Sequence, residues 1–217
     1  IEEPGVREER EFQCAPALLK KPTIFKTEID TVPWSGPYLI PDPALVGHYR
    51  GKIGKARIGL CWSSGIRTEG LWLAEYGKRK SIPLEKFREE ITHDHHMVSL
   101  QVGPERAENK DAILDVLPLK PTWDDTAALV STLDLVITVD TSVAHLAGAL
   151  GKETWVLCQR DGQSWHFMCW REGAVWNERS PWYPTARLFR QHEFNKPHHW
   201  NEVIADVAAA LNARQSP

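Results

Sequence analysis

The chain has 217 residues, of which 42% are hydrophobic and 25% charged, and its formal net charge is −3 at pH 7. This composition is ordinary for a globular protein of one large or two small domains. The small negative charge gives no electrostatic reason to expect a nucleic-acid partner. No apolar run approaches the length of a membrane span, and the charged first eleven residues do not resemble a signal peptide.

Neither disulfides nor a metal site is well supported. The four cysteines (Cys14, Cys61, Cys158 and Cys169) show no CxxC spacing. Reduced thiols, and hence a cytoplasmic location, are the default expectation. The run His93–His96 suggests metal binding, but a histidine-rich turn is more often surface, so we expect no metal.

The first fifty residues show no sustained hydrophobic period. Six prolines between positions 16 and 43 favour extended or turn geometry, and only Pro43–Arg50 has a brief helical pattern. So long a stretch without regular structure is unusual inside a compact domain. We therefore assign residues 1–50 to a connector with the remnant of a missing upstream domain, and residues 51–217 to one folded domain.

The first strand is expected at Arg57–Trp62, a short apolar run. Ser63, Ser64 and Gly65 follow at its carboxyl end, where backbone N–H groups could meet a phosphate. Residues 66–80 are polar and contain Lys78, Arg79 and Lys80 in succession. We interpret them as a loop whose cations could close over a diphosphate, although a solvated basic turn is the commoner arrangement.

Further elements follow in alternation. We expect a helix over 83–91, a strand over 97–101, a strand over 113–117, and a helix over 125–133 capped by Asp124 or Asp125. Gln101 ends its strand at the edge where doubly wound sheets bind ligands.

The most informative stretch runs from Leu133 to Leu157. It predicts a buried strand over 135–139, a turn at Asp140–Ser142, a helix to Leu150 stopped by Gly151, and a strand over 154–157. A helix start with free N–H groups, at the end of a buried parallel strand, suits an anion. His145, one turn into the helix, could reach a phosphate or a sugar hydroxyl there. The alternative is that Asp140 only caps the helix and His145 is an exposed polar residue.

A last strand over 186–190 and a final helix over 200–213 complete the pattern. Strands alternating with helices predict an α/β fold, with a Rossmann-like, doubly wound parallel sheet.

Five blocks of this sequence, in order, resemble the carboxyl-terminal, nucleotide-sugar-binding domain of GT-B glycosyltransferases. The blocks are Gly59–Ser63, Arg79–Leu84, Ser99–Gln101, Asp140–Ala149 and Ser180–Pro184. They are most similar to the lipopolysaccharide-heptosyltransferase-like family (family 9), especially to bacterial forms with tetratricopeptide repeats upstream. The resemblance covers roughly residues 33 to 211, and Asp140–Gly151 (DTSVAHLAGALG) is its most specific part.

The resemblance implies a nucleoside-diphosphate sugar as substrate, with no cofactor and no metal. It gives catalytic roles to Lys80, which would neutralise the leaving diphosphate, and to His145, which would assist. Asp140 would accept from sugar hydroxyls. The remaining donor-binding positions are Ser63, Ser64, Gly65, Gln101, Thr141, Ser142, Val143 and Ala144.

GT-B enzymes carry the acceptor site in an amino-terminal domain, and no such domain fits into residues 1–50. The resemblance therefore implies half an enzyme, inactive alone, whose acceptor is a glycan, a lipid or a protein. Two alternatives remain open. One is a degenerate, non-catalytic domain that serves as a protein-interaction module through its tryptophans. The other is a nucleotide-sugar epimerase with the GT-B fold.

Overall fold

The computed structural model describes residues 24–28, 31–65, 71–91, 96–110, 112–160, 178–193 and 199–215. The chain divides into two compact units, Ile1–Pro33 and Trp34–Pro217. The second unit contains every strand that the structure describes and all the elements described below.

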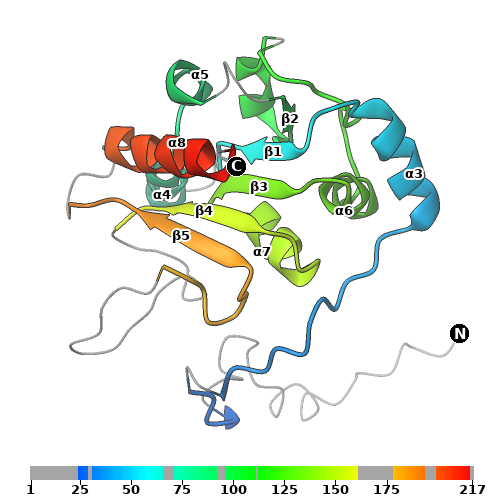
Figure 1. Ribbon diagram of the computed structural model, residues 1–217. Helices are drawn as coiled ribbons and strands as arrows, with labels where there is room; N and C mark the ends of the chain where they lie inside the picture. The colour runs from blue at the N-terminus through cyan, green and yellow to red at the C-terminus, as the bar shows by residue number, and fades with distance from the viewer. Residues whose placement is uncertain are drawn as a thin grey trace, which may run out of the picture. The chain divides into compact units, whose positions relative to one another are not determined.

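A five-stranded sheet in the order β2-β1-β3-β4-β5 forms the centre of this unit (Figure 1). All four strand pairs are parallel, which confirms the predicted doubly wound α/β fold. The strand order reverses direction between β1 and β3, so the crevice beyond their carboxyl ends is the topological switch point where such sheets bind ligands. The strands are β1 (Ile58–Cys61), β2 (Met97–Ser99), β3 (Leu135–Val139), β4 (Thr154–Cys158) and β5 (Ala186–Arg190).

Helices cover both faces of the sheet (Figure 1). Alternate residues of β3 supply the two cores: Leu135, Ile137 and Val139 pack in one, and Val136 packs in the other. The first core is closed by α5 (Leu84–Glu90) and α8 (Asn201–Gln215). The second is closed by α3 (Pro43–Lys52), α6 (Trp123–Ser131) and α7 (Ser142–Ala149).

Residues 34–50, which we assigned to the connector, pack within the same compact unit as the sheet. The helix expected from Pro43 is α3, and it lies against α6. The Tyr49 hydroxyl donates to Asp125 Oδ1 at 2.8 Å. The expectation that Asp124 or Asp125 caps α6 was wrong. Thr122 is the N-cap, and Asp125 completes a capping box by accepting from the Thr122 backbone N–H.

The segment 66–80 was expected to be a loop, but its described part, Leu71–Lys80, is helix α4. Leucine, alanine, glutamate, lysine and arginine are good helix formers, and Gly77 is the one poor helix former between Leu71 and Lys80. The three cations fall in the last turn, where they complement the negative end of the helix dipole. Lys80 is therefore held by a helix end rather than carried on a loop.

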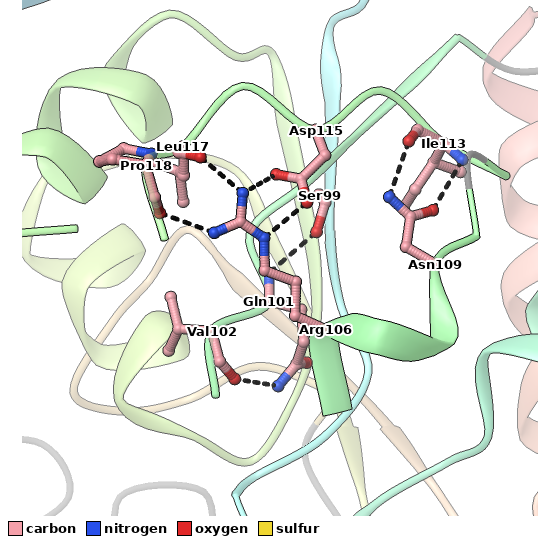
Figure 2. Close-up of polar contacts among 9 residues, drawn as sticks. All are labelled: Ser99, Gln101, Val102, Arg106, Asn109, Ile113, Asp115, Leu117 and Pro118. Atoms are coloured by element: carbon pink, nitrogen blue, oxygen red, sulfur yellow. Dashed lines mark hydrogen bonds and ion pairs between the residues drawn. The ribbon is translucent and has the colours of Figure 1, made fainter. Parts of the chain in front are cut away.

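The expected strand at 113–117 was also wrong, because only Leu114 bridges to Val98. Side chains satisfy this backbone instead (Figure 2). Asn109 exchanges two hydrogen bonds with the backbone of Ile113, each of 2.9 Å. Arg106, in the short 3-10 helix η3 (Pro104–Glu108), donates to the carbonyls of Leu117 and Pro118.

Arg106 also forms a bidentate pair with Asp115, with two N–O distances of 2.6 Å. We expect Arg106→Lys to lower the free energy of unfolding by about 2 kcal/mol, because an ammonium group cannot reproduce the planar fork. Urea denaturation measures this. The matched control is Arg88→Lys, since the pair of Arg88 with Glu85 is an exposed i,i+3 pair and its replacement should change stability by less than about 0.5 kcal/mol. Equal effects at the two positions would contradict the role given to Arg106.

In the part of the chain that the structure describes, no helix has the length and apolar character needed to cross a membrane.

Candidate functional site

Two of the loops singled out from the sequence lie side by side at the switch point. β1 pairs with β3 up to the register Cys61–Thr138, so Ser63–Gly65 and Asp140–Ser142 leave adjacent strands at the same edge of the sheet. Polar groups of both loops therefore face one crevice.

Lys80 is brought to this crevice by α4. Its Nζ lies 3.7 Å from Asp140 Oδ2, and only 14% of the lysine side chain and 4% of the aspartate side chain are exposed. The ammonium group also lies over the Tyr76 ring, 4.8 Å from its centroid. Burial and the negative charge of Asp140 both raise the pKa of Tyr76, so its hydroxyl remains protonated at neutral pH. The site thus holds a nearly buried cation at a fixed place.

The start of α7 offers fewer free donors than the sequence suggested. Thr141 is the N-cap; its Oγ1 accepts from the Val143 N–H at 3.2 Å and its carbonyl accepts from the Ala144 N–H at 3.1 Å. Val143 and Ala144 are 5% and 0% exposed, so their side chains belong to the core. Among the described residues, none accepts from the backbone N–H of Ser142, which is exposed. An incoming anion would meet this single amide and the positive end of the helix dipole.

The apolar face of α7 lies on the sheet, as expected, and the opposite face contacts Tyr183. Leu146, Ala147 and Leu150 are buried in the same core as β3. His145 lies on the side opposite the sheet, but there it contacts Tyr183, whose hydroxyl is 3.1 Å from His145 Nδ1. Burial lowers the pKa of His145 below its usual value, and the nearby charge of Asp140 partly opposes this. His145 is therefore neutral at pH 7.

The loop at the end of β1 is fastened to the end of α4 by Ser81, which sequence reasoning did not single out. Ser81 Oγ lies 2.9 Å from Ser63 Oγ and accepts from the Ser64 N–H at 3.2 Å. Ser81 and Ser64 both donate to the Gly77 carbonyl. Gly65 has a φ of 71°, which glycine adopts without strain. Since Ser81 follows Lys80 directly, these bonds set the position of the lysine relative to the loop.

Gln101 lies beneath this loop and is 2% exposed. Its Oε1 accepts from the backbone N–H groups of Trp62 and Ser63, at 3.1 and 2.9 Å. Its Nε2 donates to the carbonyls of Ser63 and Val102, at 3.2 and 3.0 Å. Because the amide is fully engaged, we expect Gln101 to position the loop rather than contact a base or ribose directly.

An apolar cavity of about 110 Å³ adjoins the first turn of α7. Val143 belongs both to that turn and to the cavity wall, and Trp123 at the start of α6 is 61% exposed beside it. The lining residues are Leu100, Val102, Pro121, Thr122, Trp123, Thr126 and Val143.

No group of three metal-binding side chains occurs among the described residues. His93, Asp94 and His95 lie outside those residues, as do Cys14, Cys169 and the tryptophans at 165, 170 and 176. Cys61 and Cys158 are buried free thiols. Burial raises the pKa of Cys61 to about 11, so it is a protonated thiol at neutral pH.

The chain was compared with protein families, with curated sequences and with solved structures. No protein-family model matches the chain. Protein FlbA of Caulobacter vibrioides is 28% identical over 197 residues, an alignment that covers 84% of the chain and 30% of FlbA. The solved structure of E. coli ADP-heptose LPS heptosyltransferase II matches with a TM-score of 0.51 at 14% identity, over 83% of the chain and 55% of that enzyme. The fold is that of one half of a GT-B glycosyltransferase.

The chain thus spans less than a third of FlbA and about half of the heptosyltransferase. At 14% identity the structural likeness concerns the arrangement of strands and helices. What this domain binds has to be argued from its own side chains.

Proposed function

We propose that this GT-B half binds a nucleoside-diphosphate sugar and acts as the donor domain of a metal-independent glycosyltransferase. The observation that carries the proposal is the Lys80 ammonium group, nearly buried at the switch point and 3.7 Å from Asp140. A cation so placed suits a reaction in which negative charge grows on a leaving diphosphate.

In this proposal different residues bind the diphosphate, the sugar and the base of the donor. The diphosphate takes Lys80 as its counter-ion, and the Ser142 amide at the start of α7 donates to a phosphate oxygen. Asp140, released from Lys80 by the incoming phosphate, accepts from sugar hydroxyls. The base lies in the apolar cavity beside Val143, where the Trp123 ring offers a stacking surface.

Transfer requires an acceptor site, which we assign to an amino-terminal GT-B domain outside this half. The share of the heptosyltransferase that the chain matches, 55%, supports a second half of similar size. The full protein would be a cytoplasmic bacterial enzyme with tetratricopeptide repeats, acting on a glycan, lipid or protein. This half alone is expected to bind the donor and to transfer little or nothing.

The test is isothermal titration calorimetry of the chain with UDP, GDP, ADP, CMP and their sugar conjugates. One nucleoside diphosphate is expected to bind, and Lys80→Ala with His145→Ala is expected to weaken it by about 100-fold or more, since a charged hydrogen bond contributes about 1.5–3 kcal/mol. The matched control is Lys78→Ala, which removes the same charge from an exposed position of the same helix and should leave the dissociation constant unchanged.

A thermal melt of each variant separates loss of the site from loss of the fold. Unchanged affinity in a folded double variant would refute the site. If the chain ignores every nucleotide, the degenerate interaction module becomes the better description. Its contact surface would be the apolar side chains of Val102, Leu119 and Trp123, which are 42%, 91% and 61% exposed.

A further inference from the structure

Tyr183 is a rigidly held aromatic residue that the proposed function does not yet use. It precedes β5 and is 7% exposed. Its backbone N–H donates to Ser180 Oγ at 3.3 Å and its carbonyl accepts from the Ala186 N–H at 2.8 Å. The ring lies directly on α7 at Gly148, where a Cβ atom would come within 2.5 Å of it. This ring cannot shift without disturbing the helix.

The Tyr183 hydroxyl lies between two other rings. On one side is His145, one turn before Gly148, with the ring centroids 5.7 Å apart and the planes at 67°. The second hydrogen-bond partner of the Tyr183 side chain is Tyr38. Tyr38 is held in turn, because its backbone N–H donates to the Ala149 carbonyl at 3.0 Å. A hydrogen-bonded chain therefore runs from Tyr38 through Tyr183 to His145.

The direction of the bond to His145 follows from the chemistry of the two groups. Burial raises the pKa of Tyr183 well above its usual value, so the phenol keeps its proton. Burial lowers the pKa of His145, so the imidazole is neutral. A phenol is a more acidic donor than a neutral imidazole N–H, and an unprotonated ring nitrogen is a better acceptor than a phenol oxygen. Tyr183 therefore donates its one hydroxyl proton to Nδ1 and accepts from the Tyr38 hydroxyl, and the proton of His145 lies on Nε2.

We propose that Tyr183 is a positioning residue that fixes His145 as its Nε2–H tautomer, so that the ring presents an N–H donor to the donor diphosphate. The identity of the ligand in this inference rests on the proposed function, whereas the tautomer of His145 is argued independently of it. His145 lies one turn into α7, which starts directly after Asp140 and Thr141, and Asp140 is paired with Lys80 at the crevice. A hydrogen-bond donor beside Lys80 adds to the binding of a phosphate oxygen, whereas the other tautomer would turn a lone pair toward it.

The experiment uses nitrogen-15 NMR of histidine ring nitrogens, whose chemical shifts distinguish the two neutral tautomers. The His145 signals are assigned by their loss in His145→Ala. The unmodified protein is expected to show the Nε2–H form alone. Tyr183→Phe keeps the ring on Gly148 but removes the hydroxyl, and is expected to give a mixture of tautomers. Tyr49→Phe is the matched control, since it removes a buried tyrosine hydroxyl that donates to Asp125, and should leave His145 unchanged.

Finding His145 as the Nδ1–H tautomer, or unchanged in a folded Tyr183→Phe variant, would overturn the inference. A second measurement titrates both proteins with UDP, GDP and ADP. Tyr183→Phe is expected to raise the dissociation constant of the nucleoside diphosphate that binds by three- to tenfold. An unaltered affinity after a tautomer change would refute the role of Tyr183 in donor binding. Failure of the unmodified protein to bind any diphosphate would refute the proposed function itself, while the tautomer result would still stand.

Discussion

Gln101→Ala is expected to lower the free energy of unfolding by about 3–5 kcal/mol, because each buried polar group left without a partner costs about 1–3 kcal/mol. The substitution removes the oxygen that accepts from the Trp62 and Ser63 backbone N–H groups and the NH2 group that donates to two backbone carbonyls. It also frees the loop that Ser81 fastens beside Lys80. We therefore expect weaker nucleotide binding as well as lower stability. Chemical denaturation measures the loss of stability, and calorimetry measures the loss of nucleotide affinity.

Gln191→Ala is the matched control for Gln101. Gln191 is 3% exposed and makes comparable bonds at the end of β5, accepting from the Arg160 N–H and donating to the His199 carbonyl. Its loss should destabilise the protein but leave the dissociation constant of any bound nucleotide unchanged at temperatures where the variant is folded. If Gln101→Ala retained full affinity, Gln101 would serve the fold alone and not the placement of the site.

Gly148→Val is expected to destabilise the protein by about 3 kcal/mol, the upper end of the usual cost of an overpacked core. The Cβ atom would lie 2.5 Å from two atoms of the Tyr183 ring, one of them the Cγ atom closest to the backbone, so the ring cannot swing aside at small cost. Tyr183 must leave the face of α7, and its bond to His145 is lost with it. Thermal and urea denaturation measure the stability. The histidine NMR spectrum should report the same change of tautomer as Tyr183→Phe.

Gly47→Val separates this packing effect from the preference of valine in helices. Gly47 lies in α3, is exposed, and has no heavy atom within 4 Å of the position of a Cβ atom. Since valine and glycine differ by only a few tenths of a kcal/mol in helix propensity, Gly47→Val should be close to neutral. Similar losses at both positions would mean that the Tyr183 ring does not occupy the place described.

The sequence predicted most of the local structure because local structure depends on neighbouring residues. The strands at 135–139 and 186–190 were predicted to the residue. At 135–139 the reason is a short apolar run with β-branched residues, which suits a buried parallel strand. Gly151 ends α7 with a φ of 67°, as the glycine stop signal indicated. The errors at 71–80 and 113–117 have different causes. The polar and basic character of 71–80 concealed a run of good helix formers. At 113–117 the side chains of Asn109 and Arg106 bond to the backbone in place of a strand ladder.

By itself the sequence determined the alternation of strands and helices, the two polar junctions at Ser63 and Asp140, and the placement of His145 away from the sheet. Only the tertiary structure decided which of these groups lie together. Gln101 bonds to the backbone of Trp62 and Ser63, which precede it by 39 and 38 positions. Tyr183 contacts His145, 38 positions earlier in the chain, and Lys80 pairs with Asp140. The physical reason is that periodicity and capping are fixed within one or two turns of chain. Pairings across many residues depend on the packing of whole elements, for which a single sequence carries no local signal.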